Sequence, residues 1–233
     1  MRIALLGYGK MGKIIESIAL ERGHTISLKA DSKTTTLNLS ETDVAIDFSL
    51  PHTAVDNITA SIDAGVPVIS GTTGWLGHYD TIVDHCKSKN GAFLYASNFS
   101  LGVNIFFEVN RVLSKMIADL PQYKVSIEEI HHTQKLDAPS GTAISLAEGI
   151  IGSSGYKNWT MDTPENKEIG ITAKRIENVP GTHSIDYSSE VDSIEIKHTA
   201  HSRMGFALGA VIAAEWIKDK KGVFSMKDVL NIG

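Results

Sequence analysis

The sequence predicts an α/β protein, with a parallel sheet and crossover helices in about its first hundred residues and an α+β region with a mixed sheet after them. Three observations support this fold class. Short apolar runs alternate with helix-period segments up to residue 98, which is the pattern of βα units. A glycine-rich turn joins the first apolar run to the first helix. Beyond residue 100, three strand-like runs follow one another without a helix between them, which is typical of antiparallel or mixed sheets.

The strands of the first region lack clean alternation of apolar and polar residues, as expected where helices cover both faces of a parallel sheet. They are predicted at residues 2–6, 25–30, 43–48, 66–70 and 92–95. Helices are predicted at 10–22 and from near His52 and Tyr79. Residues 31–42 are too few and too rich in Thr and Ser for a crossover helix, so we expect one helix of the usual arrangement to be missing.

The second region is predicted to begin near residue 101. Its helices are expected at 103–120, ended by Pro121, and at 142–151. Its strands are expected at 124–130, 170–176, 182–187 and 192–199. A last helix at 204–218 is apolar around most of its surface and needs burial, so we expect it to return to the first domain. The predicted domains are therefore residues 1–100 with 204–233, and residues 101–203.

Composition narrows the functional class. The formal net charge is −5 and no stripe of Lys and Arg is present, which argues against nucleic acid or an anionic membrane as a partner. Cys86 is the single cysteine, so no disulfide can form within the chain and a reducing compartment is favoured. The opening apolar run lacks the features of a signal peptide, and the run at 206–214 is too short to span a bilayer. We therefore expect a cytoplasmic protein.

The turn after the first strand is a candidate dinucleotide-binding loop. It matches G-x-G-x-x-G and consists of Gly7, Tyr8, Gly9, Lys10, Met11 and Gly12. In such loops the glycines allow a tight turn, close approach to a pyrophosphate and close helix–strand packing, while the helix start offers N–H donors. A turn that only packs a helix on the sheet is the alternative. The strand–loop–helix context favours a shortened Rossmann-type dinucleotide-binding domain.

Further cofactor contacts are expected at the carboxyl ends of the strands. Asp31, about twenty residues beyond the loop, is placed to accept hydrogen bonds from an adenosine ribose, which favours NADH. Lys29 and Lys33 could instead meet the extra phosphate of NADPH, and Asp31 could be only a turn residue. Two loops are candidates to hold the nicotinamide, although each could be an ordinary loop: Gly71, Thr72 and Thr73, and then Ala96, Ser97, Asn98 and Phe99.

The densest group of chemically active residues follows the strand at 124–130. His131 and His132 leave the end of this strand, and Lys135 comes shortly after them. Adjacent side chains on a strand point to opposite faces, so we expect one histidine at most to face a site. An imidazole can exchange a proton near neutral pH, and the lysine supplies a positive charge.

An anion site is predicted just beyond this group. Ser140 is suited to cap the helix that follows, and the first N–H groups of that helix, at Gly141 and Thr142, can bind a carboxylate. A hydride acceptor that carries carboxylates requires a proton donor, a cation and such an anion site. His198 and His201 lack the spacing of a metal site, so we predict no metal.

These motifs resemble those of the dihydrodipicolinate reductase family over nearly the whole chain. The likeness is most specific in residues 131–143, HHTQKLDAPSGTA, and extends to segments 7–12, 71–74, 98–100 and 198–207. The resemblance implies that His131 is the proton donor and acceptor, with Lys135 as the other catalytic cation. It implies that His132 and the helix start at 140–142 hold carboxylates of 4-hydroxy-tetrahydrodipicolinate, a small cyclic dicarboxylate. It also implies NADH or NADPH as cofactor and a homotetramer whose substrate-domain sheets pack together.

Three features depart from the family pattern: a glycine loop one residue shorter than usual, a shorter segment after Asp31 that begins with Ser32, and the absence of the usual glycines at 175–178. Two other functions stay open, namely a different Rossmann imine or amino-acid dehydrogenase and a non-catalytic dinucleotide-binding sensor. The sequence also leaves open the choice between NADH and NADPH, the oligomeric state, and whether the enzyme dehydrates its own substrate.

Overall fold

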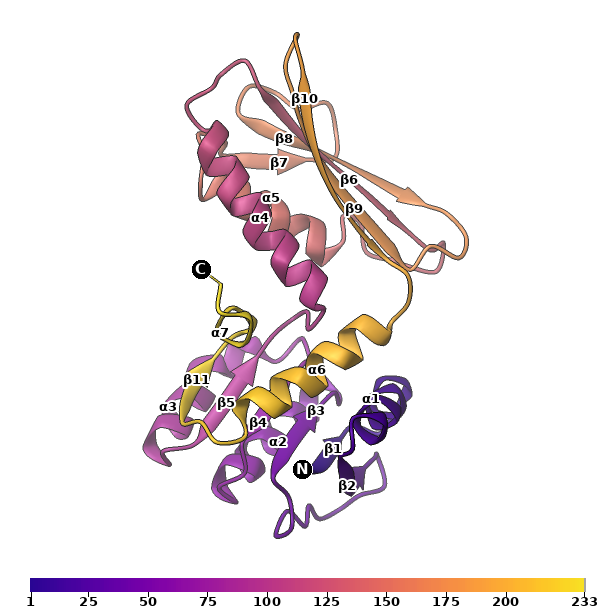
Figure 1. Ribbon diagram of the computed structural model, residues 1–233, viewed down its shortest axis with the longest axis vertical. Coiled ribbons are helices and arrows are strands. Elements are labelled where there is room, and N and C mark those ends of the chain that lie inside the picture. Colours follow the sequence, from indigo (N-terminus) through magenta and orange to yellow (C-terminus); the bar gives the residue numbers. More distant parts are fainter. Residues whose placement is uncertain (233) are drawn as a thin grey trace. The chain divides into compact units, whose positions relative to one another are not determined.

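The computed structural model describes residues 1–232 and divides into two compact units. Unit 1 consists of residues 1–104 together with the chain from residue 204 onward, and unit 2 consists of residues 105–203 (Figure 1). Within residues 1–232, no helix is both long enough and apolar enough to cross a lipid bilayer.

Unit 1 is built on a six-stranded parallel sheet with the strand order β11-β5-β4-β3-β1-β2. The strands are β1 (Arg2–Leu6), β2 (Thr25–Ala30), β3 (Val44–Asp47), β4 (Val68–Ser70), β5 (Ala92–Tyr95) and β11 (Gly222–Phe224). Successive side chains point to opposite faces, and both faces are apolar. In β1, for example, Ile3 and Leu5 join one buried cluster while Ala4 and Leu6 join another.

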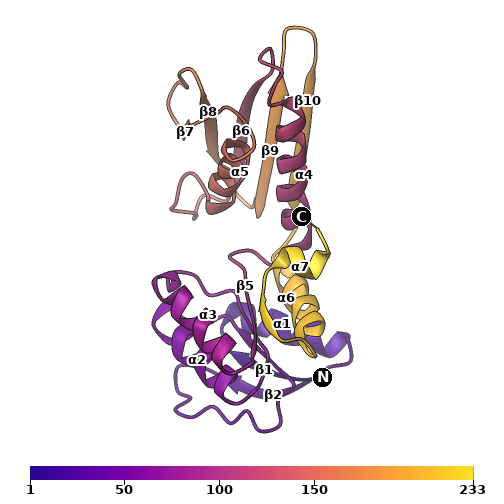
Figure 2. The ribbon, with the colours of Figure 1, turned by 90° about the vertical axis from the view of Figure 1, so that its left-hand side faces the viewer.

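Helices cover both faces of this sheet, as Figure 2 shows. α1 (Lys10–Glu21), α6 (Met204–Ile217) and α7 (Met226–Leu230) pack on one face, and α2 (Pro51–Asp63) and α3 (Tyr79–Ser88) pack on the other. The short 3₁₀ helix η1 (Leu76–His78) leads into α3. The α6 helix is buried around most of its circumference, which explains its nearly continuous apolar sequence.

The predicted strands and helices of this region are present, and residues 31–42 contain no helix, as expected from their sequence. The observed β3 and β4 are shorter than the predicted ranges 43–48 and 66–70. β11 and α7 were not predicted, because elements of three and five residues are too short to show a hydrophobic period.

Unit 2 contains a five-stranded sheet with the strand order β10-β9-β6-β8-β7. Its strands are β6 (Lys124–His131), β7 (Asn158–Thr160), β8 (Glu168–Arg175), β9 (Gly181–Ser188) and β10 (Ser193–Ala200). β6 pairs with β8 in parallel and with β9 in antiparallel orientation, so the predicted mixed sheet is confirmed. The three-residue β7 was not predicted.

α4 (Leu101–Ile117) and α5 (Gly141–Ile151) cover one face of the unit 2 sheet (Figure 2). The central strand β6 alternates in burial and directs Val125, Ile127, Glu129 and His131 toward these helices. The inward row of β6 therefore begins with two apolar side chains and ends with two polar ones. This change from apolar to polar residues marks the candidate site in unit 2.

Candidate functional site

The glycine loop of unit 1 has the geometry that a dinucleotide-binding turn requires. Gly7 has a φ of +106°, and a Cβ there would lie 2.1 Å from the carbonyl oxygen of Phe48, so only glycine fits. Gly9 caps the start of α1, and a Cβ at Gly9 would meet no atom within 4 Å. The chain therefore leaves open space beside Gly9, at the helix start. The last three loop residues, Lys10, Met11 and Gly12, form the first turn of α1.

The adenosine end of the predicted cofactor site contains two carboxylates with different partners. Glu16 accepts a hydrogen bond from the Tyr8 hydroxyl and lies 2.5 Å from Lys29 Nζ, which also lies 5.1 Å from the centre of the Tyr8 ring. Lys29 is therefore neutralised by Glu16. Asp31 Oδ1 accepts hydrogen bonds from the backbone N–H of Lys33 and the hydroxyl of Thr34, so Asp31 does have a turn role.

A buried carboxylate that sequence analysis missed organises the 71–73 loop. Asp47, at the end of β3, has no exposed surface. Its oxygens accept hydrogen bonds at 2.6 to 3.0 Å from Ser49, Asn57, Ser70 and Thr72. Burial raises the pKa of Asp47, although these four bonds oppose the shift. The position of an aspartate at the end of a buried strand was the only sequence signal for it.

The residues of the two predicted nicotinamide loops differ in exposure. Thr72 is buried and donates a hydrogen bond to Asp47, whereas Thr73 is exposed and Gly71 is half-buried. In the second loop Ser97 is exposed, Ala96 and Asn98 are half-buried, and the ring of Phe99 packs in the core beside Phe48. Phe99 therefore has only its backbone to offer a ligand.

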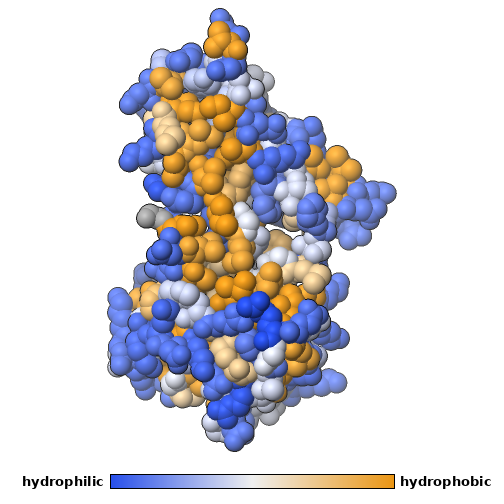
Figure 3. All heavy atoms as spheres, viewed as in Figure 1, coloured by the Kyte–Doolittle hydropathy of each residue, from blue (hydrophilic) through white to orange (hydrophobic). Residues whose placement is uncertain are grey.

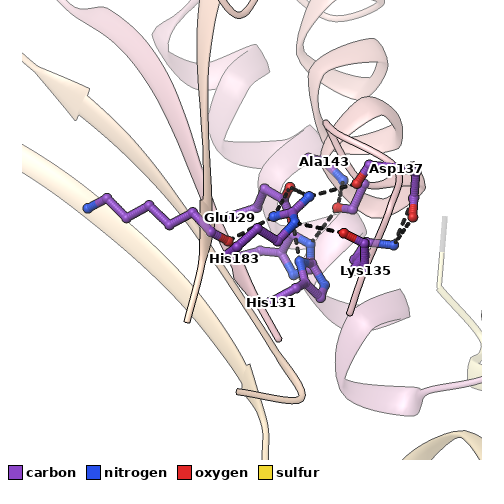
Figure 4. A network of polar contacts seen from close by, with 9 residues as sticks. Glu129, His131, Lys135, Asp137, Ala143 and His183 are labelled. Atoms are coloured by element: carbon purple, nitrogen blue, oxygen red, sulfur yellow. Dashed lines mark hydrogen bonds and ion pairs between the residues drawn. The ribbon is translucent and has the colours of Figure 1, made fainter. Parts of the chain in front are cut away.

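In unit 2, register brings together side chains from three strands, as the close view in Figure 4 shows. Glu129 Oε2 contacts His131 Nδ1 on β6. Arg175 on β8 is the register partner of His131, and both of its terminal nitrogens lie 3.0 Å from Glu129 Oε1. His183 on β9 is the register partner of Glu129, and its ring centre lies 5.0 Å from that of His131.

The loop after β6 carries the other predicted catalytic residue. Lys135 Nζ lies 2.8 and 2.7 Å from the two carboxylate oxygens of Asp137. His131 is buried, whereas His132 lies in the turn beyond the strand and is half-buried. His132 Nδ1 is buried without a hydrogen-bond partner among the described residues, and His132 lines a hollow of about 500 Å³ together with Arg203. His132 lies beyond the end of β6, so the alternation of side chains along a strand, from which we expected one histidine at most to face a site, does not apply to this pair.

Ser140 caps α5 as predicted. Its hydroxyl accepts a hydrogen bond from the backbone N–H of Ala143 at 3.2 Å and lies 3.0 Å from His183 Nε2. Gly141 is exposed and Thr142 is half-buried at the helix start. The first N–H groups of a helix have no partner within it, so they can bind an anion.

The electrostatics of the cluster depend on burial. Burial lowers the pKa of His131, and the Glu129 carboxylate partly offsets this shift. Burial, together with the positive charges of neighbouring groups, lowers the pKa of His183 to about 3, so His183 is neutral at physiological pH. One ligand atom each from Glu129, His131 and His183 lie within 4.8 Å of one another, a spacing that could also hold a metal ion. Arg175, however, already supplies a positive charge to Glu129.

The sequence did not predict that Glu129, Arg175 and His183 belong to the site. Glu129 carried a weak signal, since it lies two positions before His131 on an alternating strand and therefore on the same face. Arg175 and His183 are brought in by strand register, which the sequence does not reveal.

Comparisons with known proteins agree over nearly the whole chain. The family models described as dihydrodipicolinate reductase, N-terminus and C-terminus, match residues 1–99 and 102–230. A 4-hydroxy-tetrahydrodipicolinate reductase of Christiangramia forsetii is 57% identical over 99% of this chain and 98% of its own. The enzyme of the same name from Methanosarcina acetivorans is 40% identical over 85% of this chain and 76% of its own.

Solved structures share the fold at lower sequence identity. A dipicolinate-bound dihydrodipicolinate reductase from Paenisporosarcina superposes with a TM-score of 0.81 at 21% identity, covering 97% of each chain. An aspartate dehydrogenase from Thermotoga maritima superposes with a TM-score of 0.52 at 14% identity, covering 96% of this chain and 99% of its own. At these identities the likeness concerns the fold.

Proposed function

The chain belongs to the dihydrodipicolinate reductase family, and from this premise we propose that His131 and Lys135 carry out the proton chemistry of the family's reaction in it. The protein is an NAD(P)H-dependent oxidoreductase. It reduces 4-hydroxy-tetrahydrodipicolinate to tetrahydrodipicolinate in lysine and diaminopimelate biosynthesis. The observation that carries the assignment of residues is the buried contact between Glu129 and His131, next to the loop that bears Lys135.

Unit 1 is the proposed dinucleotide-binding domain. The open space at Gly9 and the N–H groups at the start of α1 suit a pyrophosphate, and Asp31 Oδ2 takes no part in the turn bonds and can accept from a ribose hydroxyl. The carboxyl ends of β4 and β5, with residues 71–73 and 96–99, suit the nicotinamide. Once bound, the reduced nicotinamide supplies the hydride.

Unit 2 is the proposed substrate domain. The helix start at Ser140, Gly141 and Thr142 binds one carboxylate of the ring through backbone N–H groups. His132, with its unpaired buried nitrogen, and Arg203 in the same hollow suit the other carboxylate. The ammonium group of Lys135 attracts the doubly charged ring electrostatically. A substrate carboxylate can contact this ammonium group while Asp137 also contacts it.

His131 is the proposed proton donor. Its Nδ1 faces Glu129, which leaves Nε2 as the atom that exchanges a proton with the substrate. The ring hydroxyl leaves as water to give a conjugated ring; the hydride then adds to one ring carbon and His131 donates a proton to the neighbouring carbon, while Lys135 stabilises the charge that develops on the ring.

A homotetramer in the cytoplasm is the proposed state of the protein. An apolar stripe on α4 is exposed in the single chain and supports association with further copies; Figure 3 shows apolar side chains gathered there. It consists of Ile105, Val109, Val112 and Met116. Cys86 is buried and unpaired, which suits a reducing compartment.

Turnover of the cyclic substrate tests this function. Purified protein is supplied with NADH or NADPH and freshly generated 4-hydroxy-tetrahydrodipicolinate, and cofactor oxidation is followed by absorbance. We expect turnover, with competitive inhibition by pyridine-2,6-dicarboxylate, a flat mimic of the ring and its two charges. Oxidation with a panel of acyclic imino acids but not with the cyclic substrate would instead favour a different imine dehydrogenase, and cofactor binding without turnover would favour a sensor.

A further inference from the structure

We propose that Glu129 and Arg175 are positioning residues for the reductase reaction. Glu129 holds the His131 ring with Nε2 free for proton transfer, and Arg175 ties Glu129 to the backbone of the loop that carries Lys135. This inference rests on the proposed function of His131 and Lys135 and adds the two groups through which their geometry is set.

Glu129 is a carboxylate placed where an unpaired charge would be costly. Its side chain has no exposed surface, in a row of β6 residues otherwise directed into the apolar core. Removal of an ionised carboxylate from water is unfavourable unless charged or hydrogen-bonding partners replace the water. Oε1 accepts hydrogen bonds from two nitrogens of Arg175, which supply the compensating charge, and Oε2 lies in close contact with His131 Nδ1.

The contact with Glu129 selects one tautomer of His131. A carboxylate only accepts, so Nδ1 must carry a proton, and Nε2 is then the nitrogen that gains and loses one. Residues of β9 also pack against the His131 ring. A Cβ on Gly181 would lie 3.1 Å from Nε2, and the planes of the His131 and His183 rings meet at 71°. Glu129, Gly181 and His183 together leave the ring few orientations.

Arg175 connects this carboxylate to the catalytic loop. In addition to Glu129, it donates to the backbone carbonyl of Asp137 at 2.6 Å and to that of Lys135 at 3.4 Å. One planar guanidinium can reach a carboxylate and two carbonyls in different directions, whereas the ammonium group of a lysine is a compact point charge that lacks this fixed fork. The position of Lys135 relative to His131 therefore depends on Arg175.

The pH dependence of the reaction should report this arrangement. The charged and titratable groups that face His131 are Glu129 on its own strand, Arg175 on β8, His183 on β9 and Lys135 on the loop. Glu129 is the negative one, and it raises the pKa of His131 against the effect of burial. When its charge is removed, the positive charges of Arg175 and Lys135 are no longer offset and lower the pKa of His131, so His131 loses its proton at lower pH.

The test compares Glu129→Gln and Arg175→Lys with a matched control in unit 1. There Glu215 contacts Arg22 and His24. These are the residue types that Glu129 contacts in unit 2, but the group in unit 1 lies near the surface. We expect Glu129→Gln to lower kcat at least about tenfold, because the variant loses the carboxylate that fixes the tautomer of the proposed proton donor. Its profile of kcat/KM against pH should move to lower pH, while the Kd for NADH stays unchanged. Arg175→Lys should raise the KM for the cyclic substrate more than it lowers kcat. Glu215→Gln should change none of these quantities.

Several outcomes would overturn the proposal. A kcat for Glu129→Gln as high as that of Glu215→Gln, or a pH profile that stays in place, would show that Glu129 has only a structural role. Activity that requires added Zn²⁺ and is lost with a chelator would assign Glu129, His131 and His183 to a metal site instead.

A measurement on the unaltered protein guards against variants that fail to fold. Nitrogen NMR of the His131 ring in the wild-type enzyme should show protonated Nδ1, and a protonated Nε2 with bare Nδ1 would contradict the proposal. This experiment is informative even if the wild type does not reduce the cyclic substrate. Failure of the proposed function can thus be told apart from failure of the positioning role.

Discussion

Among residues 1–232, each unit has one fully buried carboxylate on a central strand, Asp47 in unit 1 and Glu129 in unit 2, and the two have different partners. Asp47 in unit 1 accepts hydrogen bonds only from neutral groups, three hydroxyls and one amide. Glu129 in unit 2 faces a guanidinium and an imidazole. Both lie beside loops that we assign to ligands, so the difference concerns what each carboxylate does for its loop.

A carboxylate that accepts hydrogen bonds from neutral donors fixes the orientation of those donors, and their charge stays zero. Asp47 therefore orients Ser49, Ser70 and Thr72 and fixes the shape of the loop at 71–73, as a binding site requires. Glu129 instead acts on a group that gains and loses a proton, and it alters the pKa of that group. If His131 is the proton donor, as we propose, unit 1 uses its buried carboxylate to fix the shape of a loop and unit 2 uses its own to assist proton transfer.

The largest expected effect tests the second half of this comparison. Replacement His131→Gln removes the proposed proton donor, and we expect kcat to fall by about 10²- to 10⁴-fold, the usual range for positioned proton transfer. The Kd for NADH, measured by fluorescence titration, should not change. His24→Gln, a histidine that also contacts a glutamate, is the control and should leave kcat unaltered. Normal turnover by His131→Gln would remove the basis for the assignment.

The next largest effect concerns unit 1 and tests whether Asp47 fixes the shape of the loop at 71–73. In Asp47→Asn, an NH₂ group replaces one acceptor oxygen and faces side-chain donors, so we expect a loss of about 1–3 kcal/mol in the free energy of unfolding. NADH binding should weaken because the loop at 71–73 loses its fixed shape. Calorimetric titration with pyridine-2,6-dicarboxylate, which we assign to unit 2, should give an unchanged affinity. Equal weakening of both ligands would mean that Asp47 supports the whole fold and not one loop.

The pH dependence of stability should have opposite signs at Asp47 and Glu215. The folded-state pKa of Asp47 is raised above its ordinary value of 3.8, so its stabilising contribution is complete below that pH and is lost as pH rises through the folded-state pKa. The pKa of Glu215 is lowered from 4.5, chiefly by its hydrogen bond to Arg22, so its contribution is present above that pH and is lost as pH falls. Urea unfolding of Asp47→Asn and Glu215→Gln between pH 3.5 and about 7 should therefore give differences from wild type that change in opposite directions. Parallel changes would contradict the assigned shifts.

Features encoded by nearby residues could be predicted from the sequence, whereas contacts made by strand pairing could not. Features encoded by neighbours along the chain were recovered, namely the glycine turn, the mixed sheet and the cap at Ser140. The partners of His131 were not, because Arg175 and His183 lie 44 and 52 residues further along and reach it only through the register of β8 and β9. Asp47 was missed because its four donors are Ser, Thr and Asn, which occur in any loop and carry no spacing signal.

A third carboxylate, partly open to solvent, extends the comparison and gives the smallest expected effect. Glu16 neutralises Lys29 beside the predicted ribose site, and its pKa is lowered chiefly by the hydrogen bond from Lys29. In Glu16→Gln this ammonium group is released and becomes available to the extra phosphate of NADPH, whereas Asp31 still serves the ribose of NADH. We expect the ratio of kcat/KM for NADPH to that for NADH to rise by less than about tenfold, because solvent screens a charge pair at the surface. The double variant Glu16→Gln, Lys29→Gln should return the ratio to its original value, because no cation remains to be released. A ratio that rises in both variants would show that Glu16 repels the phosphate directly and that Lys29 takes no part.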